Sequence, residues 1–167
     1  MITQVARMFQ RRDPQREAAQ ALARITTLCD VGSLPWTSGV YEDRRVRDEL
    51  ATSLGVWITV IEESQPDETI SLEHMRHIIC CDLRANGFGV LSATPLDGSH
   101  FVLAVPNGAE TEDSWKFFVV RGCHQSMCPG GWFRLGLHAE RLIDPTSSQR
   151  IEFRTQWADY LANVKVD

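Results

Sequence analysis

The stretch from Ser71 to Val105, SLEHMRHIICCDLRANGFGVLSATPLDGSHFVLAV, decides the expected fold because it joins a helical pattern to two strand patterns. Its first half predicts a helix, since apolar residues recur at three- and four-residue steps along one face. Ser71 is a suitable N-cap for that helix, and Asn86-Gly87 supplies a left-handed residue of the kind that often ends one. The apolar residues of the predicted face are Leu72, Met75, Ile79 and Leu83.

The second half of the same stretch predicts two neighbouring strands. Residues 88–94 and 100–105 have strand-like composition, and Asp97-Gly98 between them predicts a turn. The run from Phe101 to Val105 is apolar without alternation. A strand with that pattern is usually covered on both faces, so we expect it in the middle of a sheet.

Elsewhere, helical patterns come first, strand patterns follow, and a helical pattern closes the chain. This order predicts an α+β fold, in which helices from the N-terminal half and a C-terminal helix pack against an antiparallel sheet of four or five strands. The strands fall mostly in the second half, and we expect a single domain over residues 1–167. The remaining predicted elements are a helix beginning at Asp13-Pro14, a helix over 41–54, strands over 56–61, 115–121 and 132–138, and a helix over 151–164.

The composition is that of a globular protein, with 43% hydrophobic and 23% charged residues among 167. The net charge of −5 argues against broad nucleic-acid binding, which needs a cationic surface. No apolar run approaches the roughly 20 residues of a membrane helix, and no secretory signal is recognisable. Five cysteines without such a signal indicate reduced thiols. We therefore expect a cytoplasmic protein, and the preference for arginine over lysine suggests a bacterial one.

Residues 1–12 are cationic, with Arg7, Arg11 and Arg12 and no acidic residue. A loosely docked N-terminal segment is the simpler interpretation. Contact with an acidic partner or a membrane surface is the alternative.

Four residues could form a metal site. His77 and Cys81 stand at i and i+4 of the predicted helix, and Cys123 and Cys128 form a C-x4-C loop flanked by glycines. Such ligands could close a tetrahedral zinc site, although zinc-binding pairs usually lie closer together in sequence. Solvated side chains are the alternative, and no other cofactor is predicted.

A histidine at the head of a buried strand, GSHFVLAV, and a later Asp-Pro in IDPTSSQRIEFRTQW carry a resemblance to the papain-like cysteine peptidases, in particular those that cut bacteriocin leader peptides. The resemblance implies a triad of Cys29, His100 and Asp144. In such enzymes the cysteine begins a helix and follows a glutamine. Here Cys29 ends a predicted helix, and Ala23 stands at the glutamine position, so the resemblance implies a degenerate relative as readily as an active hydrolase.

A variant of this hypothesis pairs His100 with Cys123 or Cys128 and uses Asp113 as the orienting acid. No helix begins after either cysteine, so the sequence shows nothing that would lower the pKa of the thiol. A core histidine bonded to the backbone is the alternative role for His100.

Binding to a protein partner is the function that the sequence favours. The chain has five tryptophans, and tryptophan and arginine are enriched where proteins contact one another. The residues expected to form this contact are Trp36, Tyr41, Arg44, Arg45 and Arg47.

Overall fold

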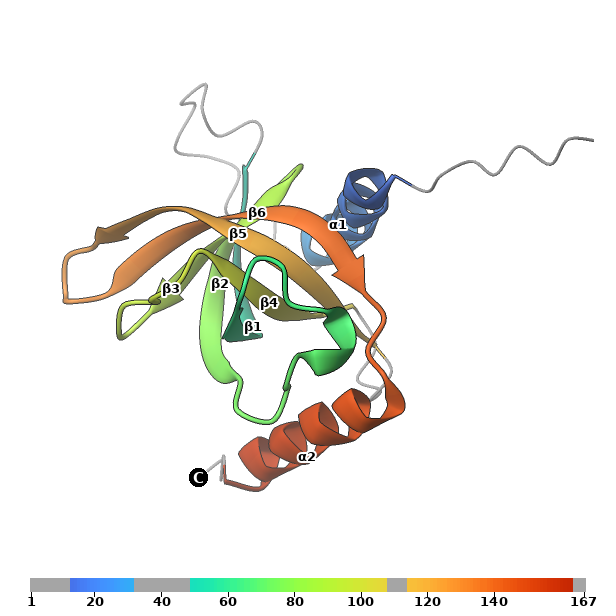
Figure 1. Cartoon of the computed structure of the whole chain (residues 1–167). Coiled ribbons are helices and arrows are strands. Elements are labelled where there is room, and N and C mark those ends of the chain that lie inside the picture. Colours follow the sequence, from blue (N-terminus) through green and yellow to red (C-terminus); the bar gives the residue numbers. More distant parts are fainter. Residues whose placement is uncertain (1–12, 32–48, 108–113, 164–167) are drawn as a thin grey trace, which may run out of the picture.

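The computed structural model describes residues 13–31, 49–107 and 114–163, which form a closed barrel of antiparallel strands with two helices (Figure 1). Around the barrel the strands run in the order β1-β2-β3-β6-β5-β4, and β4 pairs with β1 to close it. The elements are α1 (Pro14–Val31), β1 (Glu49–Ile61), the 3-10 turn η3 (Asp67–Thr69), β2 (Arg76–Arg84), β3 (Gly87–Ser92), β4 (His100–Pro106), β5 (Trp115–Met127), β6 (Phe133–Ile143) and α2 (Ser147–Asn163).

The expected α+β fold, an open sheet of four or five strands packed against helices, is therefore wrong. Two segments predicted to be helical supply the difference. Residues 76–84 of the predicted helix form β2, and residues 49–54 of the predicted helix over 41–54 belong to β1. With these strands added the sheet has no edge left, since every strand has two neighbours.

Residues 76–84 form a strand because their inward-facing positions alternate, apart from one bulge. Ile78 and Cys80 face the barrel interior, and the register with β3 then shifts by one residue at Cys81. The shift also turns Leu83 toward the interior. The buried residues are therefore spaced unevenly in the sequence, as they are on a helix. Ile79, assigned to the apolar face of the predicted helix, is 37% exposed.

The strand predicted over residues 100–105, with both faces covered, is confirmed, although a closed barrel has no middle strand. β4 lies between β1 and β5, and residues 100–105 are all buried. Phe101 and Leu103 belong to the cluster inside the barrel, whereas Val102 and Ala104 belong to a second cluster on its outer wall. The absence of alternation follows because both faces of β4 are covered.

Helix α1 contributes to the interior cluster. Asp13 accepts a hydrogen bond from the backbone N–H of Gln15 at 3.1 Å, as expected for an N-cap. The side chains of Ala18, Leu22 and Ile25 are buried and pack with the residues inside the barrel. No helix in the described ranges is long and apolar enough to cross a membrane.

Helix α2 covers the outer cluster, in which Phe153 packs edge-on against Phe117 and Trp57. Polar side chains on the same face bind the segment before β2. The Gln149 amide donates to the carbonyl oxygens of Asp67 and Ile70 at 2.6 and 2.7 Å, and the Glu152 carboxylate accepts from the N–H of Leu72. Gln156 bonds to both backbone groups of Met75.

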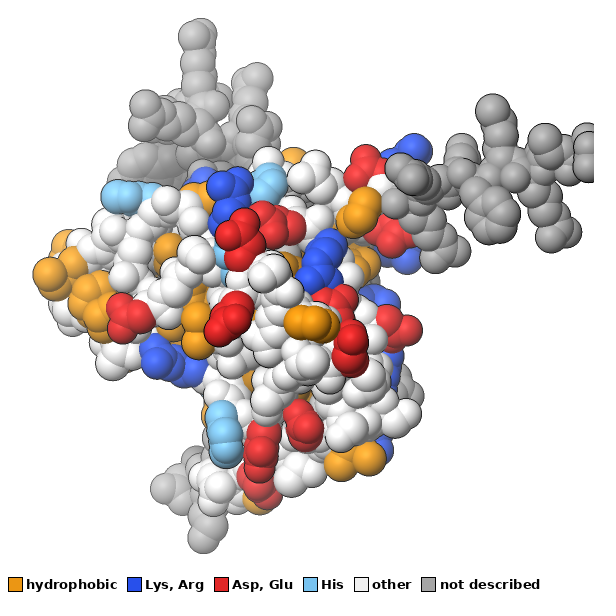
Figure 2. Space-filling model, in the orientation of Figure 1, with side chains coloured by type: hydrophobic (Ala, Val, Ile, Leu, Met, Phe, Trp, Pro, Cys, Tyr) orange, Lys and Arg blue, Asp and Glu red, His pale blue; other side chains and the backbone are white. Residues whose placement is uncertain are grey.

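Strands β5 and β6 form a hairpin that is longer than the strands predicted over 115–121 and 132–138. Pairing of β5 with β4 ends at Arg121 and His100, and residues 122–127 of β5 pair only with β6. This part of the hairpin projects from the barrel in Figure 1. Apolar side chains gather at the same end of the molecule in Figure 2.

We expect Gln149→Ala to lower the free energy of unfolding by about 2 kcal/mol, because the carbonyl oxygens of Asp67 and Ile70 and the backbone N–H of Thr146 lose their hydrogen-bond partner. Urea denaturation followed by circular dichroism would measure the change. Thr155→Ala, at an exposed position of α2, is the control and should change stability by less than about 0.5 kcal/mol. Equal effects of the two substitutions would contradict this role of Gln149.

Candidate functional site

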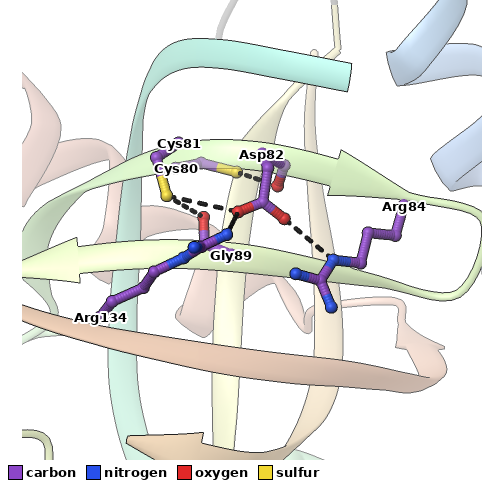
Figure 3. Close-up of polar contacts among 6 residues, drawn as sticks. All are labelled: Cys80, Cys81, Asp82, Arg84, Gly89 and Arg134. Atoms are coloured by element: carbon purple, nitrogen blue, oxygen red, sulfur yellow. Dashed lines mark hydrogen bonds and ion pairs between the residues drawn. The ribbon is translucent and has the colours of Figure 1, made fainter. Parts of the chain in front are cut away.

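A buried carboxylate on the outer wall of the barrel binds two arginines (Figure 3). Asp82 lies on β2 and is 5% exposed, so its charge requires partners. Its Oδ1 accepts a hydrogen bond from Nε of Arg84 at 3.1 Å, and its Oδ2 accepts one from Nη2 of Arg134 at 2.7 Å. Because Arg134 lies on β6, this ion pair links β2 to β6 across β3.

Gly89 makes that link possible. It stands opposite Asp82 on β3, and Gly136 stands opposite Gly89 on β6. A Cβ atom at Gly89 would lie 1.8 Å from Oδ2 of Asp82, so the carboxylate occupies the space of the missing side chain. The absence of a side chain at this position lets Asp82 reach Arg134.

The Cys81 thiol completes the group. Its Sγ lies 3.4 Å both from Oδ2 of Asp82 and from the carbonyl oxygen of Gly89, and can donate to either. Burial, and after it the adjacent Asp82 charge, raises the pKa of the Cys81 thiol to about 11. The thiol is therefore protonated at neutral pH and is a poor nucleophile there.

Both guanidinium groups reach the surface. The side chains of Arg84 and Arg134 are 42% and 44% exposed, although each is held by a carboxylate that is almost fully buried. A guanidinium offers five N–H donors in a planar fork that matches the oxygens of phosphate or carboxylate. The buried carboxylate thus holds two guanidinium groups at one place on the wall of the barrel.

The four residues proposed for zinc lie on strands and on the hairpin. His77 packs against the rings of Trp57 and Tyr160 at centroid distances of 5.0 and 4.6 Å, and burial lowers its pKa. Cys81 bonds to Asp82, as above. Cys123 lies on β5, and Cys128 lies at the turn that follows. Within the described ranges, no group of three or more histidine, cysteine or acidic side chains could hold a metal ion.

Two residues of the hydrolase hypothesis, His100 and Asp144, have other polar partners in the structure. His100 is buried at the start of β4, with its Nδ1 3.0 Å from Oγ of Ser99 and its Nε2 3.8 Å from a carboxylate oxygen of Glu140. Asp144 is exposed and pairs with Arg150 instead. Cys29 lies in α1, outside the residues whose side chains are described. The expectation of a cysteine-hydrolase-like fold is wrong, because the chain forms a closed barrel.

The residues proposed for a protein contact, Trp36, Tyr41, Arg44, Arg45 and Arg47, lie outside the described residues, as do residues 1–12 and Asp113. Sequence interpretation also missed the group around Asp82. A helix over 71–86 places Asp82 among solvated side chains. On a strand, the alternating residues Asp82 and Arg84 lie on one face, beside the glycines of the GFG sequence. This pattern indicates the ion-paired group only if the segment is predicted to be a strand.

No protein-family model matches the sequence, and no curated protein matches it. Two solved structures show a weak overall similarity to this chain. The inhibitor of motility MotI/DgrA of Bacillus subtilis is 14% identical with a TM-score of 0.42, and the match covers 71% of this chain and 52% of that one. PlzA of Borreliella burgdorferi, solved in complex with c-di-GMP, is 10% identical with a TM-score of 0.40, and the match covers 87% and 60%. The chain therefore spans little more than half the length of either neighbour.

We expect Gly89→Ala to destabilise the protein by about 2 kcal/mol or more, because the new Cβ displaces the Asp82 carboxylate from Arg134. Thermal and urea denaturation would measure the loss. Gly136→Ala is the matched control on the neighbouring strand, since its Cβ would meet nothing closer than Cβ of Cys123 at 4.0 Å. Similar losses in the two variants would show that the carboxylate is not the cause.

The raised pKa predicts slow alkylation of Cys81. A shift from 9.0 to about 11 lowers the thiolate fraction at mildly alkaline pH about a hundredfold. We expect iodoacetamide to label the exposed Cys123 while Cys81 stays unlabelled, as measured by mass spectrometry of the digested protein. Labelling in denaturant is the control, in which all cysteines should react. Labelling of native Cys81 as fast as Cys123 would contradict the prediction.

Proposed function

We propose that this barrel is a non-catalytic binding domain for a small anionic ligand carrying a phosphate group, and that Arg84 and Arg134 hold that ligand. The observation that carries the proposal is the shared carboxylate. Asp82 is buried and fixes both arginines, whose side chains nevertheless remain more than 40% exposed. Two guanidinium groups oriented in this way can bind phosphate oxygens through several charge-assisted hydrogen bonds.

Preorganisation favours binding at this place. A flexible arginine loses side-chain entropy when a ligand immobilises it, at a cost of about 0.5–1.5 kcal/mol per side chain. Arg84 and Arg134 are already bonded to Asp82, so part of this cost is met on folding. Arg134 also stands on β6 opposite Leu91 of β3, which places its backbone within the sheet rather than on a mobile loop.

A small ligand suits the charge of the chain better than a nucleic-acid polymer does. The net charge is −5, and polymer binding requires many cationic contacts to release counterions. A compact phosphate compound needs only the local pair of guanidinium groups. The protonated Cys81 thiol agrees with a binding role, since it contributes a hydrogen-bond donor and no nucleophile.

Isothermal titration calorimetry of the full chain would test the proposal. The panel of ligands is inorganic phosphate, ATP, GTP, cyclic di-AMP and cyclic di-GMP. The last is included because it is the compound bound to PlzA. We expect binding of at least one phosphate compound, with affinity falling about tenfold or more in Arg84→Gln and in Arg134→Gln, because each change removes charged hydrogen bonds.

Arg150→Gln is the matched control, since Arg150 is similarly exposed but pairs with the exposed Asp144 outside the Asp82 group. Arg134→Lys separates ligand binding from folding, because it keeps the charge beside Asp82 while removing the planar fork. Absence of binding across the panel, or equal affinity in the Gln variants and the wild type, would refute the proposal.

Binding to a protein partner remains a prediction from the sequence. The five residues on which it rests fall outside the described part of the chain. The contacts among the described residues give no support to a protein partner at those five positions. They favour ligand binding by the Asp82 group instead.

A further inference from the structure

One edge of strand β5 lacks a neighbouring strand near the hairpin turn. Within the barrel every strand has two neighbours, but the β5–β6 hairpin extends beyond it (Figure 1). Pairing of β5 with β4 ends at Arg121, and the N–H of Gly122 then donates to the carbonyl of Ser99. From His124 to Met127 the strand pairs only with β6 among the described residues. The opposite side of this segment is therefore a free strand edge.

The backbone groups of Gln125 and Met127 point out from this edge. At the turn, the N–H of Cys128 donates to the carbonyl of Trp132, so this pair is hydrogen-bonded. Successive residues of an antiparallel strand face opposite neighbours, and the register with β6 has no shift between Gln125 and Met127. Both residues thus turn their N–H and C=O groups away from β6. The N–H of Leu96 reaches only the side chain of Gln125.

The free edge carries none of the devices that usually keep a strand edge from pairing. Monomeric proteins protect such edges with charged side chains or proline. Residues 123–128 contain neither. The bulge of β5 lies at the start of this segment, between Gly122 and His124, and Met127 near its end is 70% exposed. The edge is therefore open to pairing with another strand.

The surroundings of the edge favour a second copy of the chain over a charged partner. The arginines that flank the edge are already paired, Arg121 with Glu140 at 3.3 Å and Arg134 with the buried Asp82 at 2.7 Å. Like charges directly opposite each other destabilise a strand pair, and residues 123–128 bring none together. Two copies can therefore meet at this edge although each carries a net charge of −5.

We propose that two copies of the chain pair through this edge, antiparallel and about a two-fold axis at Ser126. This register sets Gln125 of each copy opposite Met127 of the other, so the outward N–H and C=O groups of both residues gain partners. Ser126 then lies opposite its own copy. The edge is self-complementary, as a two-fold interface requires, whereas a foreign strand would have to supply matching groups of its own. The inference goes beyond the proposed ligand and does not depend on it.

Disulfide crosslinking of the full chain tests the register. Directly opposed residues of a non-hydrogen-bonded pair have Cα atoms about 4.5 Å apart, which is within the reach of a disulfide. Ser126→Cys in a C123S/C128S background should therefore form a covalent dimer under mild oxidation. Thr155→Cys in the same background, at an exposed position of α2, is the control and should stay mostly monomeric. Equal crosslinking of the two variants would overturn the proposal.

Light scattering after size-exclusion chromatography tests the backbone hydrogen bonds. We expect the wild type to have twice the mass of one chain at high micromolar concentration. Met127→Pro removes an N–H that the single chain does not use, so its association should weaken about tenfold or more. Met127→Thr removes the same side chain but keeps the N–H, and should dimerise nearly as well as the wild type. Circular dichroism would establish that both variants are folded.

A wild type that stays monomeric over this concentration range, or a Met127→Pro variant that dimerises as strongly as Met127→Thr, would overturn the proposal. Photo-crosslinking from position 126 in cells that yields an adduct with another protein, and no dimer, would overturn it in favour of a foreign strand. Calorimetry with the phosphate panel should be unchanged in Met127→Pro, so failure here and failure of the proposed function are distinguishable.

Discussion

Closure of the sheet between β1 and β4 is the constraint on which the rest of this structure depends. The pairing of residues 57–61 with residues 100–104 gives each strand two neighbours and encloses one apolar cluster within the barrel. It also gives the barrel an outer wall, part of which is covered by α2. The barrel wall has an inner and an outer face. Side chains on the inner face can therefore form the apolar core while those on the outer face carry polar groups.

The Asp82 group shows how that outer wall carries polar chemistry. Phe88 and Val90 fill the interior from β3, while Gly89 between them leaves space on the other side for a carboxylate. The carboxylate is buried by its position over the sheet and by its partners. It therefore contributes both to the pairing of three strands and to the fixed orientation of the two arginines at the surface.

Residues with local signals were predicted well, and those that depend on distant pairing were not. The apolar run of β4, the N-cap at Asp13 and the strands near residues 88, 115 and 133 carry their own patterns. The helix predicted over 71–86 combined two unrelated sets of buried residues. Leu72 and Met75 are buried in the cluster beneath α2, whereas Leu83 faces the barrel interior. The site was missed for a similar reason, because Arg134 is 52 positions from Asp82 in the sequence.

The bulge at Cys81 has a consequence for any alignment of this strand with one from another barrel. In a regular strand, side chains alternate between the two faces, so counting from Cys80 would place Asp82 in the apolar interior of the barrel and Leu83 on the outside. The additional residue reverses that parity. An alignment without a one-residue gap at Cys81 will place Asp82 opposite a side chain that faces the barrel interior of the other protein. It will therefore overlook a corresponding acidic residue on the outer wall of that protein.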